Sequence, residues 1–161
     1  MNAEQIIMVQ ILDREWTQEA LHCACRLARN TSATIVLVKM IPVQHPGWLG
    51  TDLGYQNFTA QEQAEYADYQ TTLEDYGVEF TALLFQYLTL TDAIAQAAEH
   101  VNAQIVFARV PDSIIPFWTQ FQQWSLKRQL TRQQRRLIKD LVYDLDDPLP
   151  AIEAFAGLHH R

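Results

Sequence analysis

The chain has 161 residues, 48% of them hydrophobic, and a formal net charge of -7 at pH 7. Its length suits one domain that can bury a core without disulfides or metals. The negative charge argues against nucleic-acid and anionic-membrane partners, because such a protein repels phosphate. No apolar run is long enough to span a membrane, and the first residues lack the features of a secretion signal, so we expect a cytoplasmic protein.

The first half of the chain alternates short apolar runs with a helical pattern. Residues 5–12 and 33–41 are almost wholly apolar and partly β-branched, which is typical of strands buried on both faces of a parallel sheet. Between them, residues 17–30 carry alanine and leucine at helical spacing. Pro42 ends the second strand, and residues 43–59 hold three of the five glycines and are predicted to form a long loop.

The middle of the chain continues this alternation. Thr59 begins a sequence that resembles a capping box and opens a helix, which Gly77 closes. Residues 78–88 and 103–110 are predicted strands, and the alanine-rich segment 92–102 between them is a predicted helix. Regular alternation of short strands and helices predicts an α/β fold with a doubly wound parallel sheet.

The last third is less regular. A helix that begins near Phe117 is predicted to continue past Arg132, because leucines recur at helical steps beyond it. The segment Leu141–Leu145 is then the predicted last strand. We expect a single domain of residues 1–147, followed by a C-terminal tail of residues 148–161.

The two cysteines, Cys23 and Cys25, lie two positions apart in a predicted helix. They therefore point about 200° apart and cannot easily form a disulfide or share a metal. We interpret them as structural thiols, and we expect no metal and no cofactor.

The order of these motifs resembles the universal stress protein family. The resemblance rests on the strings EALHCACRLARNTSATIVLVKMIPV, LEDYGVEFTALLF and DAIAQAAEHVNAQIVFARV, and it covers about residues 6–110. It implies a flavodoxin-like strand order of 3-2-1-4-5 and a homodimer formed through the last strand. For part of the family it also implies ATP, bound by a glycine motif after the fourth strand.

That glycine motif is not intact in this chain. The family pattern is a glycine, two residues, a glycine, nine residues, a glycine and then Ser or Thr. With the final hydroxyl residue placed on Ser125, its three glycine positions hold Pro111, Ile114 and Trp124. Proline removes an N–H donor, and the two larger side chains fill the volume of a phosphate. We therefore expect no ATP binding through this motif.

Other ligand-binding candidates remain, some implied by the resemblance (Asp13, Met40 and Ile41) and others argued from their place in the predicted fold. Asp13 follows the first strand, where it either contacts a ligand or caps the next helix. Arg109 interrupts an apolar strand close to the same crevice, where it either forms an ion pair with Asp13 or joins Arg14 in an anion site. The full set of ligand-binding candidates is Asp13, Arg14, Met40, Ile41, Arg109 and Ser125.

The predicted fourth helix carries an aromatic group and a basic face. The aromatic side chains could form core, an adenine platform or a partner surface, and the basic residues 128–139 could contact a partner or face solvent. We expect a homodimer in which this helix and the predicted last strand both take part. Its interface candidates are Phe117, Phe121, Trp124, Leu141 and Tyr143.

No catalytic motif occurs in the sequence, which contains no nucleophile elbow, no zinc-protease signature, no Walker sequence and no dinucleotide fingerprint. We therefore interpret the chain as a universal stress protein-like regulatory or binding module rather than an enzyme, with a further protein partner possible. The alternative is a small-molecule or nucleotide-binding switch with a non-standard anion site in the crevice between the first and fourth strands.

Overall fold

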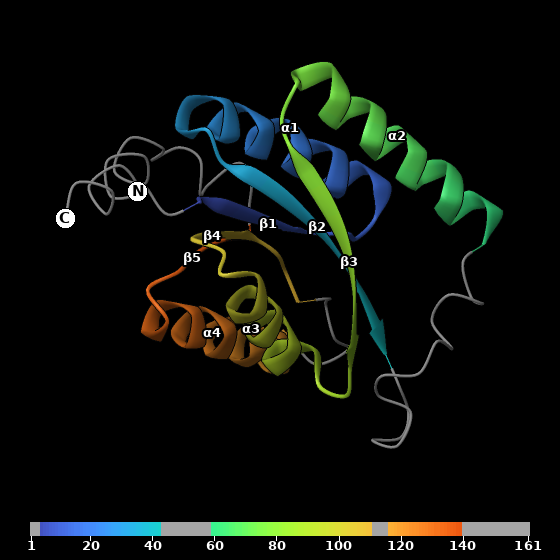
Figure 1. The fold of residues 1–161 in the computed structure, drawn as a ribbon. Coiled ribbons are helices and arrows are strands. Elements are labelled where there is room, and N and C mark those ends of the chain that lie inside the picture. Colours follow the sequence, from blue (N-terminus) through green and yellow to red (C-terminus); the bar gives the residue numbers. More distant parts are fainter. Residues whose placement is uncertain (1–3, 43–58, 111–115, 140–161) are drawn as a thin grey trace.

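The fold was analysed in a computed structural model, which describes residues 4–42, 59–110 and 116–139 (Figure 1). Helices and strands alternate along these residues, as the sequence predicts. Their bounds are β1 (Ile6–Gln10), α1 (Arg14–Thr31), β2 (Thr34–Pro42), α2 (Ala60–Tyr76), β3 (Phe80–Tyr87), α3 (Leu90–Val101), β4 (Ile105–Phe107), α4 (Pro116–Arg132) and β5 (Arg136–Ile138).

The five strands form one parallel sheet in the order β3-β2-β1-β4-β5. This confirms both the parallel sheet predicted from the alternation and the strand order implied by the resemblance. Helices α1 and α2 cover one face of the sheet, and α3 and α4 cover the other (Figure 1).

Two apolar cores flank the sheet, because successive side chains of a strand point to opposite faces. Ile35 and Leu37 of β2 pack toward α1 and α2, whereas Val36, Val38 and Met40 pack toward α3 and α4. Burial on both faces explains why the central strands read as unbroken apolar runs.

The hydrogen-bond ladder between β1 and β4 is shorter than the ladder between β2 and β3. β1 and β4 pair over Ile7–Val9 and Ile105–Phe107, whereas β2 and β3 pair over Ile35–Pro42 and Phe80–Tyr87. Two glutamine side chains extend the shorter ladder. Gln104 Oε1 accepts a hydrogen bond from Ile6 N at 2.7 Å, and Gln10 Oε1 accepts one from Arg109 N at 3.2 Å.

Helix ends follow the predicted capping chemistry. The Asp13 side chain accepts a hydrogen bond from Trp16 N at 3.0 Å and begins α1 three residues earlier than the sequence predicts. Thr59 Oγ1 accepts one from Glu62 N at 3.1 Å at the start of α2. Gly77 ends α2 with φ of 70°, the left-handed conformation that glycine adopts without steric cost.

The predicted end of the sheet is wrong. The fifth strand is Arg136–Ile138, not Leu141–Leu145, and α4 ends at Arg132 instead of continuing past it. Gln134 adopts φ of 62°, and Arg135 N donates to Leu130 O at 2.8 Å, which closes the helix in a Schellman-type turn. The predicted strand 141–145 and the tail 148–161 lie outside the described residues.

Candidate functional site

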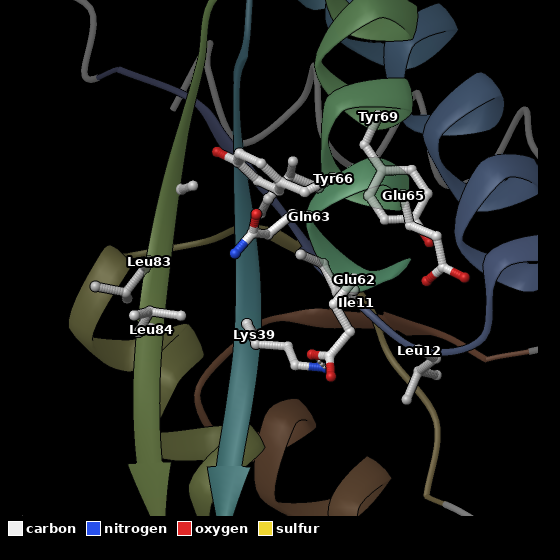
Figure 2. A pocket seen from close by; sticks show the side chains of 12 residues that line it. Ile11, Leu12, Lys39, Glu62, Gln63, Glu65, Tyr66, Tyr69, Leu83 and Leu84 are labelled. Carbon is white, nitrogen blue, oxygen red and sulfur yellow. Dashed lines mark ion pairs between the residues drawn. The ribbon is translucent and has the colours of Figure 1, made fainter. Parts of the chain in front are cut away.

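A cavity of about 490 Å³ lies between α2 and the strands β1, β2 and β3, and we refer to it as the α2 pocket (Figure 2). Its volume is in the range of small-molecule sites. The described residues that line it are Ile11, Leu12, Leu37, Lys39, Glu62, Gln63, Glu65, Tyr66, Tyr69, Ala82, Leu83 and Leu84.

The α2 pocket exists because α2 packs on the sheet mainly through its second half. The buried residues of α2 are Tyr69 and Leu73, whereas the residues of its first two turns are exposed or only partly buried. Apart from Tyr66, no large apolar side chain of those turns fills the space above β2 and β3. Apart from Lys39 of β2, the strand side of the pocket is apolar, and α2 contributes the other charged groups, Glu62 and Glu65.

Lys39 brings a charge to this apolar floor. It follows Leu37 by two positions on β2, so both side chains lie on the face of the sheet that α2 covers. Lys39 Nζ lies 3.5 Å from Glu62 Oε2, and the two side chains are 32% and 35% exposed. Figure 2 shows the Lys39 side chain reaching from β2 toward the carboxylate of α2.

A second carboxylate, that of Glu65, also lines the pocket. Its Oε1 accepts a hydrogen bond from Gln61 Nε2 at 3.1 Å. The ion pairs between described residues join Arg14 to Asp68 and Lys39 to Glu62, and Glu65 belongs to neither. The charged groups among the described lining residues are therefore one ammonium and two carboxylates.

Tyr69 forms the wall of the pocket nearest α1 and is only 1% exposed. Burial raises the pKa of its hydroxyl, and the charge of Glu65 raises it further, while nearby Thr17 opposes this shift. No described residue forms a hydrogen bond with this buried oxygen. Such an oxygen is a group that a polar ligand or a water could satisfy.

The residues that the sequence proposed for ligand binding are mostly engaged elsewhere. Asp13 caps α1, which is the second of the two roles that the sequence allows for it. Arg14 Nη2 forms an exposed ion pair with Asp68 Oδ2 at 2.9 Å and so links α1 to α2. The expected ion pair between Asp13 and Arg109 is not among those that the described residues form.

The remaining candidates lie on the other side of the sheet or at its edge. Met40 is buried in the core beneath α3 and α4, and Ile41 is partly buried near the end of β2. Ser125 lies in the interior of α4, where its Oγ accepts a hydrogen bond from Gln129 Nε2 at 3.3 Å. Gln129 Nε2 also donates to Asp92 Oδ1 at 3.2 Å, so Ser125 lies beside the contact between α4 and α3.

The aromatic residues of α4 lie on the surface. Phe117 is 74% exposed, Trp118 50%, Phe121 47% and Trp124 55%. Trp118 and Phe121 stack with ring centroids 5.6 Å apart, and Arg128 lies over the Trp124 ring at 5.2 Å. The core interpretation of this group is therefore wrong, and the residues form an exposed aromatic patch. The other interface candidates, Leu141 and Tyr143, lie outside the described residues.

Sequence reasoning missed the α2 pocket. One signal was present, because a lysine at position 39 interrupts a strand that is otherwise buried on both faces. The pocket shares no lining residue with the crevice proposed from the sequence. Among residues 4–42, 59–110 and 116–139, no cluster of histidine, cysteine or acidic side chains could hold a metal ion. No helix within those ranges has the length and apolarity to cross a bilayer.

Comparison with solved structures places the fold among universal stress proteins. A universal stress protein family member from Burkholderia pseudomallei is 18% identical, with 83% of this chain and 93% of that chain covered at a TM-score of 0.57. A universal stress protein in complex with cAMP is 15% identical, with 84% and 96% covered at 0.60.

A third structure, from Arabidopsis thaliana with AMP bound, is 10% identical, with 83% and 89% covered at 0.52. Identities this low show a shared fold, which confirms the fold that the resemblance implies. No protein-family model matches the sequence, and no curated protein matches it.

Proposed function

We propose that this chain is a non-catalytic regulatory module with a universal stress protein fold, which acts as a cytoplasmic homodimer and does not bind ATP through a glycine loop. The observation that carries the proposal is the position of α4. In the register implied by the resemblance, the glycine motif would run from Pro111 to Ser125, but α4 already begins at Pro116.

Residues 116–125 are therefore helical, which supports the proposal because the motif needs an irregular loop there. Backbone N–H groups in a helix interior are bonded to carbonyls four residues earlier, so they cannot close on a phosphate. Trp124, at the third glycine position, carries an exposed indole beneath the Arg128 guanidinium. The segment between β4 and α4 is also too short for the motif, since only residues 108–115 separate the two elements.

The homodimer is supported by the exposed aromatic patch of α4. Large aromatic side chains serve as interface anchors, and contiguous apolar surface on a soluble protein marks interaction sites. A second copy of the chain could bury this patch in a symmetric dimer, in which α4 of one protomer packs against α4 of its partner.

A nucleotide-binding switch remains the second candidate, because two proteins of the same fold are described as complexes with cAMP and with AMP. Isothermal titration calorimetry with ATP, AMP and cAMP decides between the two. We expect no ATP binding tighter than roughly 1 mM, about -4 kcal/mol. A micromolar constant for ATP that Ser125→Ala weakens would contradict the proposal, and a micromolar constant for AMP or cAMP would favour the switch.

A further inference from the structure

We propose that the α2 pocket binds a compact, largely apolar small molecule that carries an amine, and that it rejects phosphorylated or carboxylated ligands. The site reaches the carboxyl end of β1 through Ile11 and Leu12, but none of its lining residues belongs to the candidate set of the crevice between β1 and β4. The inference is independent of the dimer and of the ATP question.

The shape and chemistry of the walls favour an apolar body for the ligand. The strand side of the lining includes Ile11, Leu12 and Leu37. Leu84 of the edge strand β3 bounds the side opposite Tyr69 (Figure 2). Tyr66, in the second turn of α2, adds an aromatic ring above the strands. A flat ring placed between Tyr66 and the aliphatic floor would be desolvated on both faces.

The charges of the pocket determine which polar group the ligand should carry. The Lys39 ammonium is already matched by Glu62 at 3.5 Å, which leaves Glu65 as the lining carboxylate without a cation among the described residues. One ammonium and two carboxylates give the described lining residues a formal charge of -1, and the whole chain carries -7. An ammonium group is attracted by this field, whereas a phosphate or carboxylate is repelled.

Tyr69 supplies a second polar contact. Its hydroxyl is buried without a hydrogen-bond partner, and the charge of Glu65 acts on it. A ligand donor near Glu65 would offer the phenol oxygen a hydrogen bond that the protein does not provide. A neutral or anionic acceptor would leave the Glu65 carboxylate without a cation among the described residues.

The test uses three probes of similar size that differ in charge: naphthylmethylamine, naphthylmethanol and naphthoic acid. Each is titrated into the full chain at pH 7 and followed by amide NMR. We expect the amine to bind at least tenfold more tightly than the acid, with the alcohol between them. We also expect Glu65→Gln to reduce the preference for the amine over the alcohol to less than about threefold. Equal affinities for amine and acid, or no binding of the amine, would overturn the proposal.

Two filling variants show whether the probe occupies the pocket. Ala82→Trp fills it from β3, and Gln63→Trp fills it from α2; both positions are exposed, so the fold should tolerate the larger side chain. The matched control is Thr81→Trp, which lies next to Ala82 on the same strand but on the opposite face. We expect each filling variant to weaken amine binding at least tenfold and the control to leave it unchanged. Amine binding that survives both filling variants would place the probe elsewhere and refute the site.

Discussion

Lys39 Nζ and Glu62 Oε2 lie 3.5 Å apart, and this ion pair joins the floor of the α2 pocket on β2 to the first turn of α2. Both side chains are about one-third exposed, with values of 32% and 35%. An ion pair in such a position contributes little to stability, because water screens it and both side chains lose rotamer freedom. Its main effect is on the charge that a ligand meets.

Replacement of Lys39 should separate these two effects. We expect Lys39→Met to change the free energy of unfolding by less than about 1 kcal/mol in urea denaturation. The same variant should bind naphthylmethylamine severalfold more tightly, since it leaves a second carboxylate in the pocket without its cation. Lys127→Met, at an exposed position of α4, is the control and should change neither quantity. A loss of several kcal/mol would show that Lys39 is structural.

The Asp13 cap provides a prediction about stability. We expect Asp13→Ala to lower the free energy of unfolding by about 1 kcal/mol, because Trp16 N loses its acceptor at the start of α1. Thr89 occupies the equivalent position before α3 but makes no side-chain capping bond, so Thr89→Ala should cost only a few tenths of a kcal/mol. Thermal or urea denaturation measures both. Equal losses in the two variants would mean that the capping bond is not what stabilises α1.

The exposed aromatic patch predicts the oligomeric state. Sedimentation equilibrium at micromolar concentration should report a homodimer, and Phe121→Lys should convert it to a monomer because it places a charge in the contact. Gln120→Lys is the matched control, since Gln120 is exposed and adjacent along α4. Tyr143→Lys tests the second predicted segment. A monomeric wild-type chain would remove the dimer from the proposed function.

The buried thiol of Cys25 predicts a pH dependence. Burial raises its pKa from the ordinary 9.0 to about 11. As pH rises above 9.0, the unfolded chain loses this proton first, so the free energy of unfolding should fall by on the order of 1 kcal/mol per pH unit until the folded thiol also ionises near 11.

The measurement is urea denaturation under reducing conditions between pH 8 and pH 10, with pH values chosen to bracket the titration of the unfolded thiol. Cys25→Ala should show a shallower decline than wild type over this interval, whereas tyrosine titration affects both variants alike. Parallel curves for the two proteins would show that Cys25 does not cause the alkaline loss.

The central sheet was predictable from sequence because its physical signal is strong. Strands buried on both faces read as apolar runs, and Asp13, Thr59 and Gly77 mark helix ends by their capping chemistry. The final strand was not predictable in this way. Leu137 fits a helical leucine spacing in the sequence, yet it lies in β5, because the left-handed Gln134 ends α4 and turns the chain back onto β4.

The site was less predictable than the fold. Asp13 and Arg14 are polar residues at a strand end, a place that suits ligands and helix caps equally, and here they serve a cap and an ion pair. Apart from Tyr66, the first two turns of α2 carry no large apolar residue, and this is why the α2 pocket exists. Missing apolar residues are hard to recognise in a sequence because they produce no periodic pattern. Among the described lining residues, Lys39 is the one that stands out in the sequence. Its role in a pocket is recognisable only in the structure, where Glu62 and Tyr69 line the same cavity.

The sheet is held together unequally, because β1 and β4 pair over three residues whereas β2 and β3 pair over eight. A short ladder joins β4 to β1, with the side chains of Gln104 and Gln10 at its ends, and a second short ladder joins β5 to β4. Short ladders release more easily than long ones, so the half of the sheet that contains β4 and β5 can open as a cooperative unit while β2 and β3 stay paired. Amide protons of β4 and β5 should then exchange with solvent sooner than those of β2. The aromatic patch of α4 belongs to the unit that opens, and burial of that patch would slow its exchange.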